Sequence, residues 1–88
     1  MKTFKDLKFE SFDNEYRVGI HTRIHFENGF GASVVRHDGS YGNKDGLYEL
    51  AVLFDNEIHY DNPVAKGDVV GYLTEEQVTE LLMEIQRL

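Results

Sequence analysis

The chain has 88 residues, a net charge of −7 and no cysteine. This length predicts one domain spanning residues 1–88. The composition excludes disulfides and thiolate metal sites, and the chain lacks the run of about 20 apolar residues that a membrane span needs. The acidic half from Asp38 onward disfavours direct binding of nucleic acid, because it repels phosphate. We therefore expect a cytoplasmic protein that binds neither nucleic acid nor membrane.

The first half of the chain has the patterns of β-strands. Lys8–Phe12 is predicted to form an edge strand, and Val18–Glu27 alternates apolar with polar residues. Asn28-Gly29 then favours a two-residue type I′ turn, which predicts a hairpin with His21 opposite Arg36. In this register one face of the hairpin is aliphatic, and the other carries His21, Arg23, His25 and Arg36.

Three further strands are predicted in the second half. Leu47–Phe54 is apolar on both sides, which is typical of a central strand. Asp55-Asn56 predicts another tight turn, followed by a short strand at Glu57–Tyr60. Val69–Leu73 is predicted as a last short strand that leads into a helix.

The C-terminus has the signals of an amphipathic helix. Thr74 is a favourable N-cap, and Gln77 completes a capping box with it. Apolar residues then recur on one helical face, at Val78, Leu81, Leu82, Ile85 and Leu88. We therefore predict an α+β fold: a small antiparallel β-meander of four to five strands, with one C-terminal amphipathic helix packed on the sheet.

One helix covers only one face of such a sheet, so the second face needs its own cover. We expect that second face to include Ala32, Val34, Leu47, Ala51 and Leu53. The N-terminal segment with Phe4, Leu7 and Phe9 is one candidate for the cover. The other is a second copy of the chain or a partner protein, and Met83 on the polar side of the helix also favours a homodimer.

The segment Asp38–Gly46 is the longest irregular stretch between predicted strands. Its acids and amide suit calcium ligands, but the spacing of a calcium loop is absent, and so is the Gly-Lys-Ser/Thr of a phosphate loop. We interpret it as a wide hairpin loop whose glycines satisfy the backbone geometry, with Tyr41 available as a protein contact.

The candidate catalytic and metal-binding residues do not form a recognisable site. His21 and His25 would lie about 13 Å apart on one strand face, too far for one metal ion, and His37 is expected on the opposite face from His21. The chain has no nucleophile-elbow motif and no cysteine nucleophile. We expect no metal, no cofactor and no enzymatic activity.

The basic stripe is the strongest candidate for a binding surface. In a chain of net charge −7, His21, Arg23, His25 and Arg36, with Tyr41 from the neighbouring loop, would suit an anionic ligand or an acidic partner. The alternative is a cross-strand charge ladder in which Glu27 and Glu49 balance the arginines.

Three stretches of the sequence carry a resemblance to a known group of proteins. They are MKTFKDLKF at the start, NGFGASVVRHDGSYGNKDGLYELAVL at Asn28–Leu53, and VVGYLTEEQVTELLMEIQRL at the end. With them the chain resembles small accessory proteins encoded by tailed bacteriophages. The resemblance implies a bacterial cytoplasm during infection, and it assigns no catalytic or binding residues.

Three functions are compatible with these observations. The first is a non-enzymatic protein-binding module, a phage accessory protein that engages or inhibits a host protein. The second is an acidic mimic of DNA that occupies the nucleic-acid site of a host protein, although the acids are scattered and interleaved with Lys44 and Lys66. The third is a small enzyme or ligand-binding protein, which would need a deep pocket.

Overall fold

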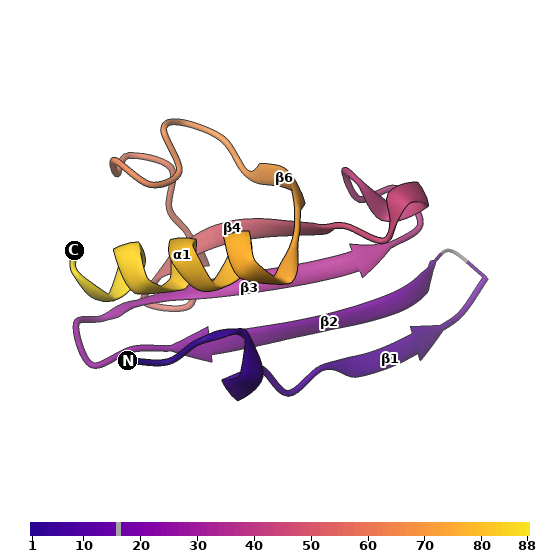
Figure 1. Ribbon diagram of the computed structural model, residues 1–88, viewed down its shortest axis with the longest axis horizontal. Helices are drawn as coiled ribbons and strands as arrows, with labels where there is room; N and C mark the ends of the chain where they lie inside the picture. Colours follow the sequence, from indigo (N-terminus) through magenta and orange to yellow (C-terminus); the bar gives the residue numbers. More distant parts are fainter. Residues whose placement is uncertain (16) are drawn as a thin grey trace.

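The computed structural model describes residues 1–15 and 17–88, which form an antiparallel sheet with one α-helix packed on it (Figure 1). Within these residues the chain has six strands, one α-helix and two short 3₁₀ helices. In chain order they are η1 (Phe4–Asp6), β1 (Glu10–Asp13), β2 (Val18–His25), β3 (Phe30–His37), η2 (Asn43–Asp45), β4 (Tyr48–Phe54), β5 (Glu57–Ile58), β6 (Val70–Leu73) and α1 (Glu75–Gln86). The predicted α+β meander with a C-terminal helix is confirmed.

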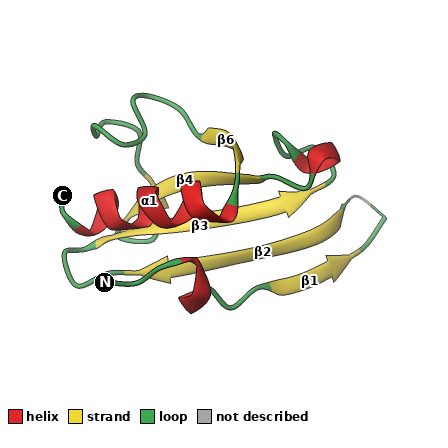
Figure 2. Cartoon of the chain, in the orientation of Figure 1, coloured by secondary structure: helices red, strands yellow, loops and turns green. Residues whose placement is uncertain are grey.

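The strands β1 to β5 form a meander, and β6 returns to the sheet beside β4. Both β5 and β6 pair with β4: β5 pairs with its last two residues, and β6 pairs with Tyr48 and Leu50 near its start. The loop 59–69 leaves the sheet between them (Figure 2) and places Val64 and Ala65 in the core. The two strands therefore act as one edge strand with an excursion between its halves.

The helix packs its apolar face on the sheet. Thr74 accepts a hydrogen bond from the Gln77 backbone (3.2 Å), and the Gln77 side chain accepts one from the Thr74 N–H (2.9 Å). This reciprocal pair confirms the predicted capping box. Val78, Leu82 and Ile85 are fully buried, and they pack with a sheet layer that includes Ala32, Val34, Leu50 and Val52.

The N-terminal segment lies on the same side of the sheet as α1. The rings of Phe4 and Phe9 pack at 5.2 Å and 5.6 Å from the ring of Tyr48, a core residue of β4. Phe4 N–H donates to Thr79 Oγ1 on α1 (3.0 Å), and Gln86 exchanges two hydrogen bonds with the Lys2 backbone. The expectation that this segment covers the second face is therefore wrong, because its aromatic residues extend the core beside the helix.

The hairpin between β2 and β3 turns differently from the prediction. Phe26 N–H donates to Phe30 O (2.8 Å) and Gly29 N–H donates to Phe26 O (3.2 Å), so the loop has three residues. Gly29 has φ +89°, whereas Asn28 has no positive φ, and this combination is a type I turn followed by a left-handed glycine. The predicted type I′ turn at Asn28-Gly29 is therefore wrong.

The Asn28 side chain explains this choice of turn. Its Nδ2 donates to Ile85 O at 2.9 Å and to Leu88 O at 3.4 Å, while its Oδ1 accepts from Phe30 N–H at 3.1 Å. Asn28 thus adds a side-chain donor to the C-terminal end of α1, where Ile85 O also accepts from Leu88 N–H (3.2 Å). The type I′ geometry appears instead at Asp55-Asn56, where both residues have positive φ (53° and 65°) between β4 and β5.

Candidate functional site

The longer hairpin loop shifts the register between β2 and β3 by one residue. Ile20 stands opposite Arg36, and His21 stands opposite Val35. Residues directly opposite one another share a face, and the faces alternate along each strand. Arg36 therefore belongs to the side of the sheet that α1 covers, whereas His21, Arg23 and His25 belong to the other side. Two residues assigned to the second face, Ala32 and Val34, also lie under the helix.

The side of the sheet opposite α1 is called the open face here. Among the described residues, neither α1 nor the N-terminal segment packs on it. Strand pairing places thirteen positions of β1 to β4 on it: Glu10, Phe12, Gly19, His21, Arg23, His25, Gly31, Ser33, Val35, His37, Glu49, Ala51 and Leu53. This face holds three of the five residues predicted to bind a partner.

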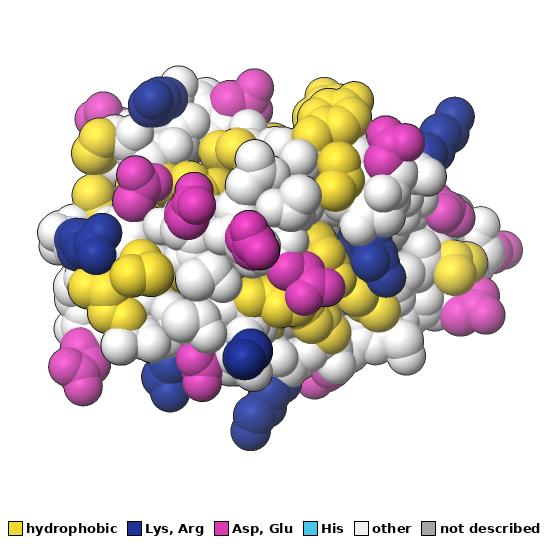
Figure 3. All heavy atoms as spheres, in the orientation of Figure 1, with side chains coloured by type: hydrophobic (Ala, Val, Ile, Leu, Met, Phe, Trp, Pro, Cys, Tyr) yellow, Lys and Arg dark blue, Asp and Glu magenta, His cyan; other side chains and the backbone are white. Residues whose placement is uncertain are grey.

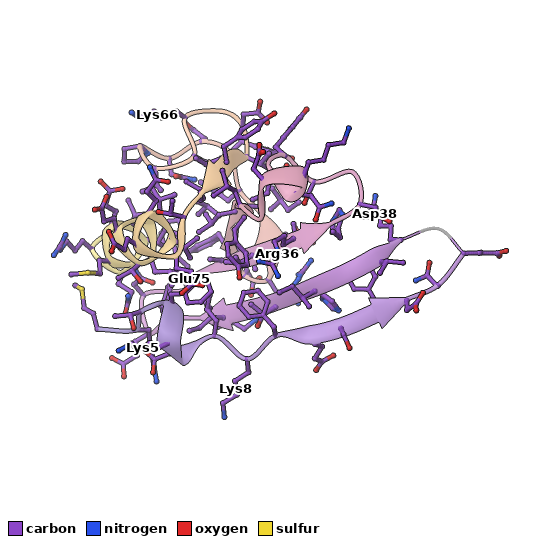
Figure 4. The ribbon with its side chains drawn as sticks, turned by 45° about the vertical axis from the view of Figure 1, so that its right-hand side comes forward. Lys5, Lys8, Arg36, Asp38, Lys66 and Glu75 are labelled. Atoms are coloured by element: carbon purple, nitrogen blue, oxygen red, sulfur yellow. The ribbon has the colours of Figure 1, made fainter. Side chains whose placement is uncertain are left out.

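Arg36 is held on the helix side (Figure 4). Its guanidinium carbon lies 5.0 Å from the centroid of the Tyr48 ring. One of its nitrogens donates to Tyr48 Oη at 3.3 Å and to Gly46 O at 3.4 Å. The predicted stripe of four side chains on one face is therefore wrong for Arg36, because a register shift of one residue moves a side chain to the opposite face.

The Arg23 side chain extends along the open face from β2 toward the turn that follows β4. Its guanidinium donates to Asn56 O (3.0 Å) and to Asn56 Oδ1 (2.9 Å) in the turn between β4 and β5. Its neighbours along this path, Ser33 and Ala51, have small side chains. Both arginines thus have partners other than the two glutamates that a charge ladder would require.

Phe12 forms the centre of a hollow at one end of the open face. Its ring packs edge-on against His21 (5.1 Å between centroids) and also against His37 (5.7 Å). The hollow has a volume of about 370 Å³ and is lined by Phe12, Asn14, Arg17, His21, Val35 and His37. We call it the Phe12 hollow. No carboxylate among the described residues lines it, although the chain has a net charge of −7.

His37 is buried on the same side as His21, where the sequence pattern had placed it on the opposite face. This expectation is wrong for the same reason as the Arg36 assignment, since the true register puts both rings against Phe12. His37 is only 8% exposed, and its Nδ1 lies 2.8 Å from Asp38 O. A carbonyl oxygen only accepts, so Nδ1 carries the proton of this bond and Nε2 is left for other interactions.

Tyr41, the fifth predicted residue, lies at a different place. The loop after β3 brings it against Tyr72 of β6 at the edge of the sheet, and the Ser40 side chain fixes the start of this loop on His37.

Within the parts of the chain that the structure describes, no group of three His, Asp or Glu side chains could hold a metal ion.

Sequence reasoning did not single out Phe12, Arg17 or Tyr72 as site residues, and it placed His37 on the wrong face. A strand pattern gives the face of Phe12 only when the register is known, and the register depended on the Asn28 turn. Tyr72 lies 31 positions from Tyr41 in the sequence, and no local pattern pairs the two.

The acidic side chains of α1 lie on the side away from the open face. Glu76, Glu80 and Glu84 are exposed and follow one another at intervals of four residues. Figure 3, which views the helix side, shows acidic side chains in a line across this part of the surface.

Comparisons with known proteins do not add a family. No family model matches the chain, and neither curated proteins nor solved structures give a significant match. In the described part of the chain, no helix is long and apolar enough to cross a membrane.

Proposed function

We propose that the protein is a non-enzymatic protein-binding module that receives an acidic segment of its partner on the open face. The observation that carries this proposal is the Phe12 hollow, which opens on the side of the sheet that no helix covers within the described residues. The resemblance to bacteriophage accessory proteins favours a protein of a bacterial host as the partner, bound or inhibited through this face.

The chemistry of the hollow favours a carboxylate. Arg17 supplies a permanent positive charge with several donors, and His21 and His37 supply ring nitrogens beside it. Phe12 contributes a flat apolar surface that the flanking rings hold in place. An acidic side chain that enters the hollow meets no described carboxylate in its walls.

The experiment is affinity capture from a bacterial lysate with three forms of the protein. The double variant Arg17→Ser, His21→Ser removes the guanidinium and one of the two imidazole rings from the hollow. Lys66→Ser is the matched control, because it also removes one positive charge but lies in the loop 59–69 between β5 and β6, away from the hollow (Figure 4). A partner that the wild type and the control retain and the double variant loses supports the proposal. Equal recovery by all three forms contradicts it.

One observation favours an acidic mimic of DNA as a second candidate. Glu76, Glu80 and Glu84 form a row on α1 with a spacing of about 6 Å, as the helical rise dictates. This row is sparser than the charges of one DNA strand, which follow every ~3.4 Å along the axis. If the row mimics DNA, the wild type releases bacterial proteins from a DNA column and the triple Glu→Gln variant does not. Equal release by both forms would count against this candidate.

A further inference from the structure

Tyr41 and Tyr72 form an exposed aromatic pair at the edge of the sheet, which we call the tyrosine pair. The two rings are nearly parallel, with an interplanar angle of 24° and centroids 6.4 Å apart. They are 58% and 61% exposed, so most of both rings contacts solvent. Figure 3 shows hydrophobic side chains that protrude between the positions of β6 and η2. The protein thus presents two large rings side by side without burying them.

Tyr72 has a backbone conformation that is unfavourable for a tyrosine. Tyr72 has φ +57°, a left-handed conformation that is uncommon for a bulky side chain. Tyr72 N–H donates to Tyr41 O at 3.3 Å, which ties the two segments together. Strained residues of this kind persist only where their surroundings hold them, and they cluster at binding sites.

Two glycines permit the close approach of the two segments. A Cβ on Gly42 would stand 3.0 Å from Tyr72 Cα, and a Cβ on Gly71 would stand 2.5 Å from Tyr41 Cβ. Gly42 also has φ +94°. Glycine is therefore favoured on both sides of the contact, because the Tyr72 backbone and the Tyr41 Cβ occupy the space that a Cβ at Gly42 or Gly71 would need.

The surroundings of the tyrosine pair are acidic. A hollow of about 550 Å³ lies between Tyr72 and the loop 38–45, with Asp38 and Asp45 in its lining against one cation, Lys44. The carboxylates stand on the same loop as Tyr41. A cation that approaches the ring faces would therefore also approach a net negative charge.

We propose that the tyrosine pair is a binding site for an arginine side chain of a peptide or protein. The guanidinium is planar and weakly hydrated, so it stacks on aromatic faces and gains from their negative quadrupole. Asp38 and Asp45 add the complementary charge. The site uses none of the residues of the Phe12 hollow and selects the opposite charge, so either site can fail a test without affecting the other.

The direct test is an NMR titration with the peptide acetyl-Gly-Arg-Gly-amide. We expect saturable shifts at the amides of Gly42, Gly71 and Tyr72, at millimolar peptide. The citrulline analogue has nearly the same shape without the charge, and we expect its affinity to be at least five-fold lower. Shifts that do not saturate, or equal affinity for arginine and citrulline, overturn the proposal.

Tyr72→Gly separates a binding role of the ring from a structural one. Glycine adopts positive φ without strain, so this variant should keep or raise the melting temperature while it loses the peptide shifts. Tyr60→Ala is the matched control, because Tyr60 is also an exposed tyrosine (47%) but lies in the loop after β5. Retained peptide binding in Tyr72→Gly contradicts the proposal.

A variant that leaves both rings in place guards against loss of structure. Asp38→Asn, Asp45→Asn keeps the tyrosine pair and removes two nearby charges. We expect this variant to bind the arginine peptide several-fold more weakly at low salt, with the same spectrum in the absence of peptide. Unchanged affinity would show that the rings do not act with these acids and would overturn the site as proposed.

Discussion

The two faces of the sheet differ in how their side chains are covered. On the helix side, α1 and the N-terminal segment bury a continuous apolar layer that includes Val34, Leu50 and Val52. On the open face no described helix lies over the strands, yet Leu53 is 0% exposed. Polar and aromatic side chains shape this side instead, with Arg23 reaching across it to Asn56 and Phe12 packing between two histidines.

This difference separates stability from binding in the molecule. Burial of apolar surface is the main stabilising term, and it is concentrated on the helix side. The open face carries the charged or polar side chains of His21, Arg23 and His25, which are exposed and lie outside the core cluster. Substitutions on the helix side should therefore lower stability, whereas substitutions of exposed residues on the open face should change binding with little effect on folding.

The largest effect is expected at the centre of the helix side. Leu82 is fully buried between α1 and the sheet, so Leu82→Ala should lower the free energy of unfolding by roughly 2–4 kcal/mol. Leu81→Ala is the control on the same helix, because Leu81 is only partly buried and should cost less. Thermal or urea melts measure both. A melt of Leu82→Ala that superimposes on that of the wild type would remove α1 from the core.

Gly29→Val should be the next most damaging change. Gly29 has φ +89°, and a Cβ there would stand 3.1 Å from a ring carbon of Phe54, so we expect a loss of about 1–3 kcal/mol. Gly39→Val is a matched control with nearly the same φ (+92°) and nothing within 4 Å of its Cβ. Urea melts should rank Gly29→Val below Gly39→Val. The reverse order would contradict the contact between the hairpin loop and Phe54.

Asn28→Gly tests which turn closes the first hairpin. A type I′ turn would tolerate glycine at both central positions, so the variant would then keep its stability. In the structure the Asn28 side chain bonds to carbonyls at the end of α1, and its loss should cost about 1 kcal/mol. A thermal melt of Asn28→Gly decides between the two-residue and the three-residue turn, and an unchanged melting temperature would favour the two-residue turn.

The smallest effect on stability is expected on the open face. Arg23 is exposed, and its hydrogen bonds to Asn56 are accessible to solvent, so Arg23→Ser should cost less than about 1 kcal/mol. A thermal melt of Arg23→Ser beside Leu82→Ala measures the difference between the two faces directly. Equal losses at the two positions would contradict the assignment of stability to the helix side.

Self-association through the open face stays a prediction. Sedimentation at tens of micromolar should show a dimer if a second copy of the chain covers this face. Phe12→Ser should then shift the protein toward the monomer, because Phe12 is the apolar centre of the hollow. A wild type that remains monomeric at these concentrations would contradict the dimer and leave the face to a different partner.

Local signals predicted the helix and much of the sheet. The capping box at Thr74 and Gln77 and the tight turn at Asp55-Asn56 depend on residues within a few positions of one another, and both are present. Asn28 failed as a local signal because its side chain bonds to Ile85 O, 57 residues away, and the turn adapts to that contact. One such long-range bond shifted the register and with it the face of Arg36 and His37.

Predicting the candidate site required more knowledge of tertiary structure than predicting the fold did. His21, Arg23 and His25 share a face in any register, because they alternate along one strand. The other residues that line the Phe12 hollow come from β1, β3 and the loops. Phe12, Arg17 and His37 could therefore be placed beside His21 only after the register was known. The tyrosine pair requires two segments whose contact no spacing rule predicts.

The most direct test of the open face as the binding surface is an NMR titration with acetylated hexaglutamate. At about 0.15 M salt, long-range repulsion from the acidic chain is largely screened beyond ~8 Å. We predict saturable shifts at His21, Val35 and His37, no shifts along α1, and loss of these shifts in the Arg17→Ser, His21→Ser variant at an unchanged melting temperature. Absence of saturable shifts on the open face, or their persistence in that variant, would contradict the account.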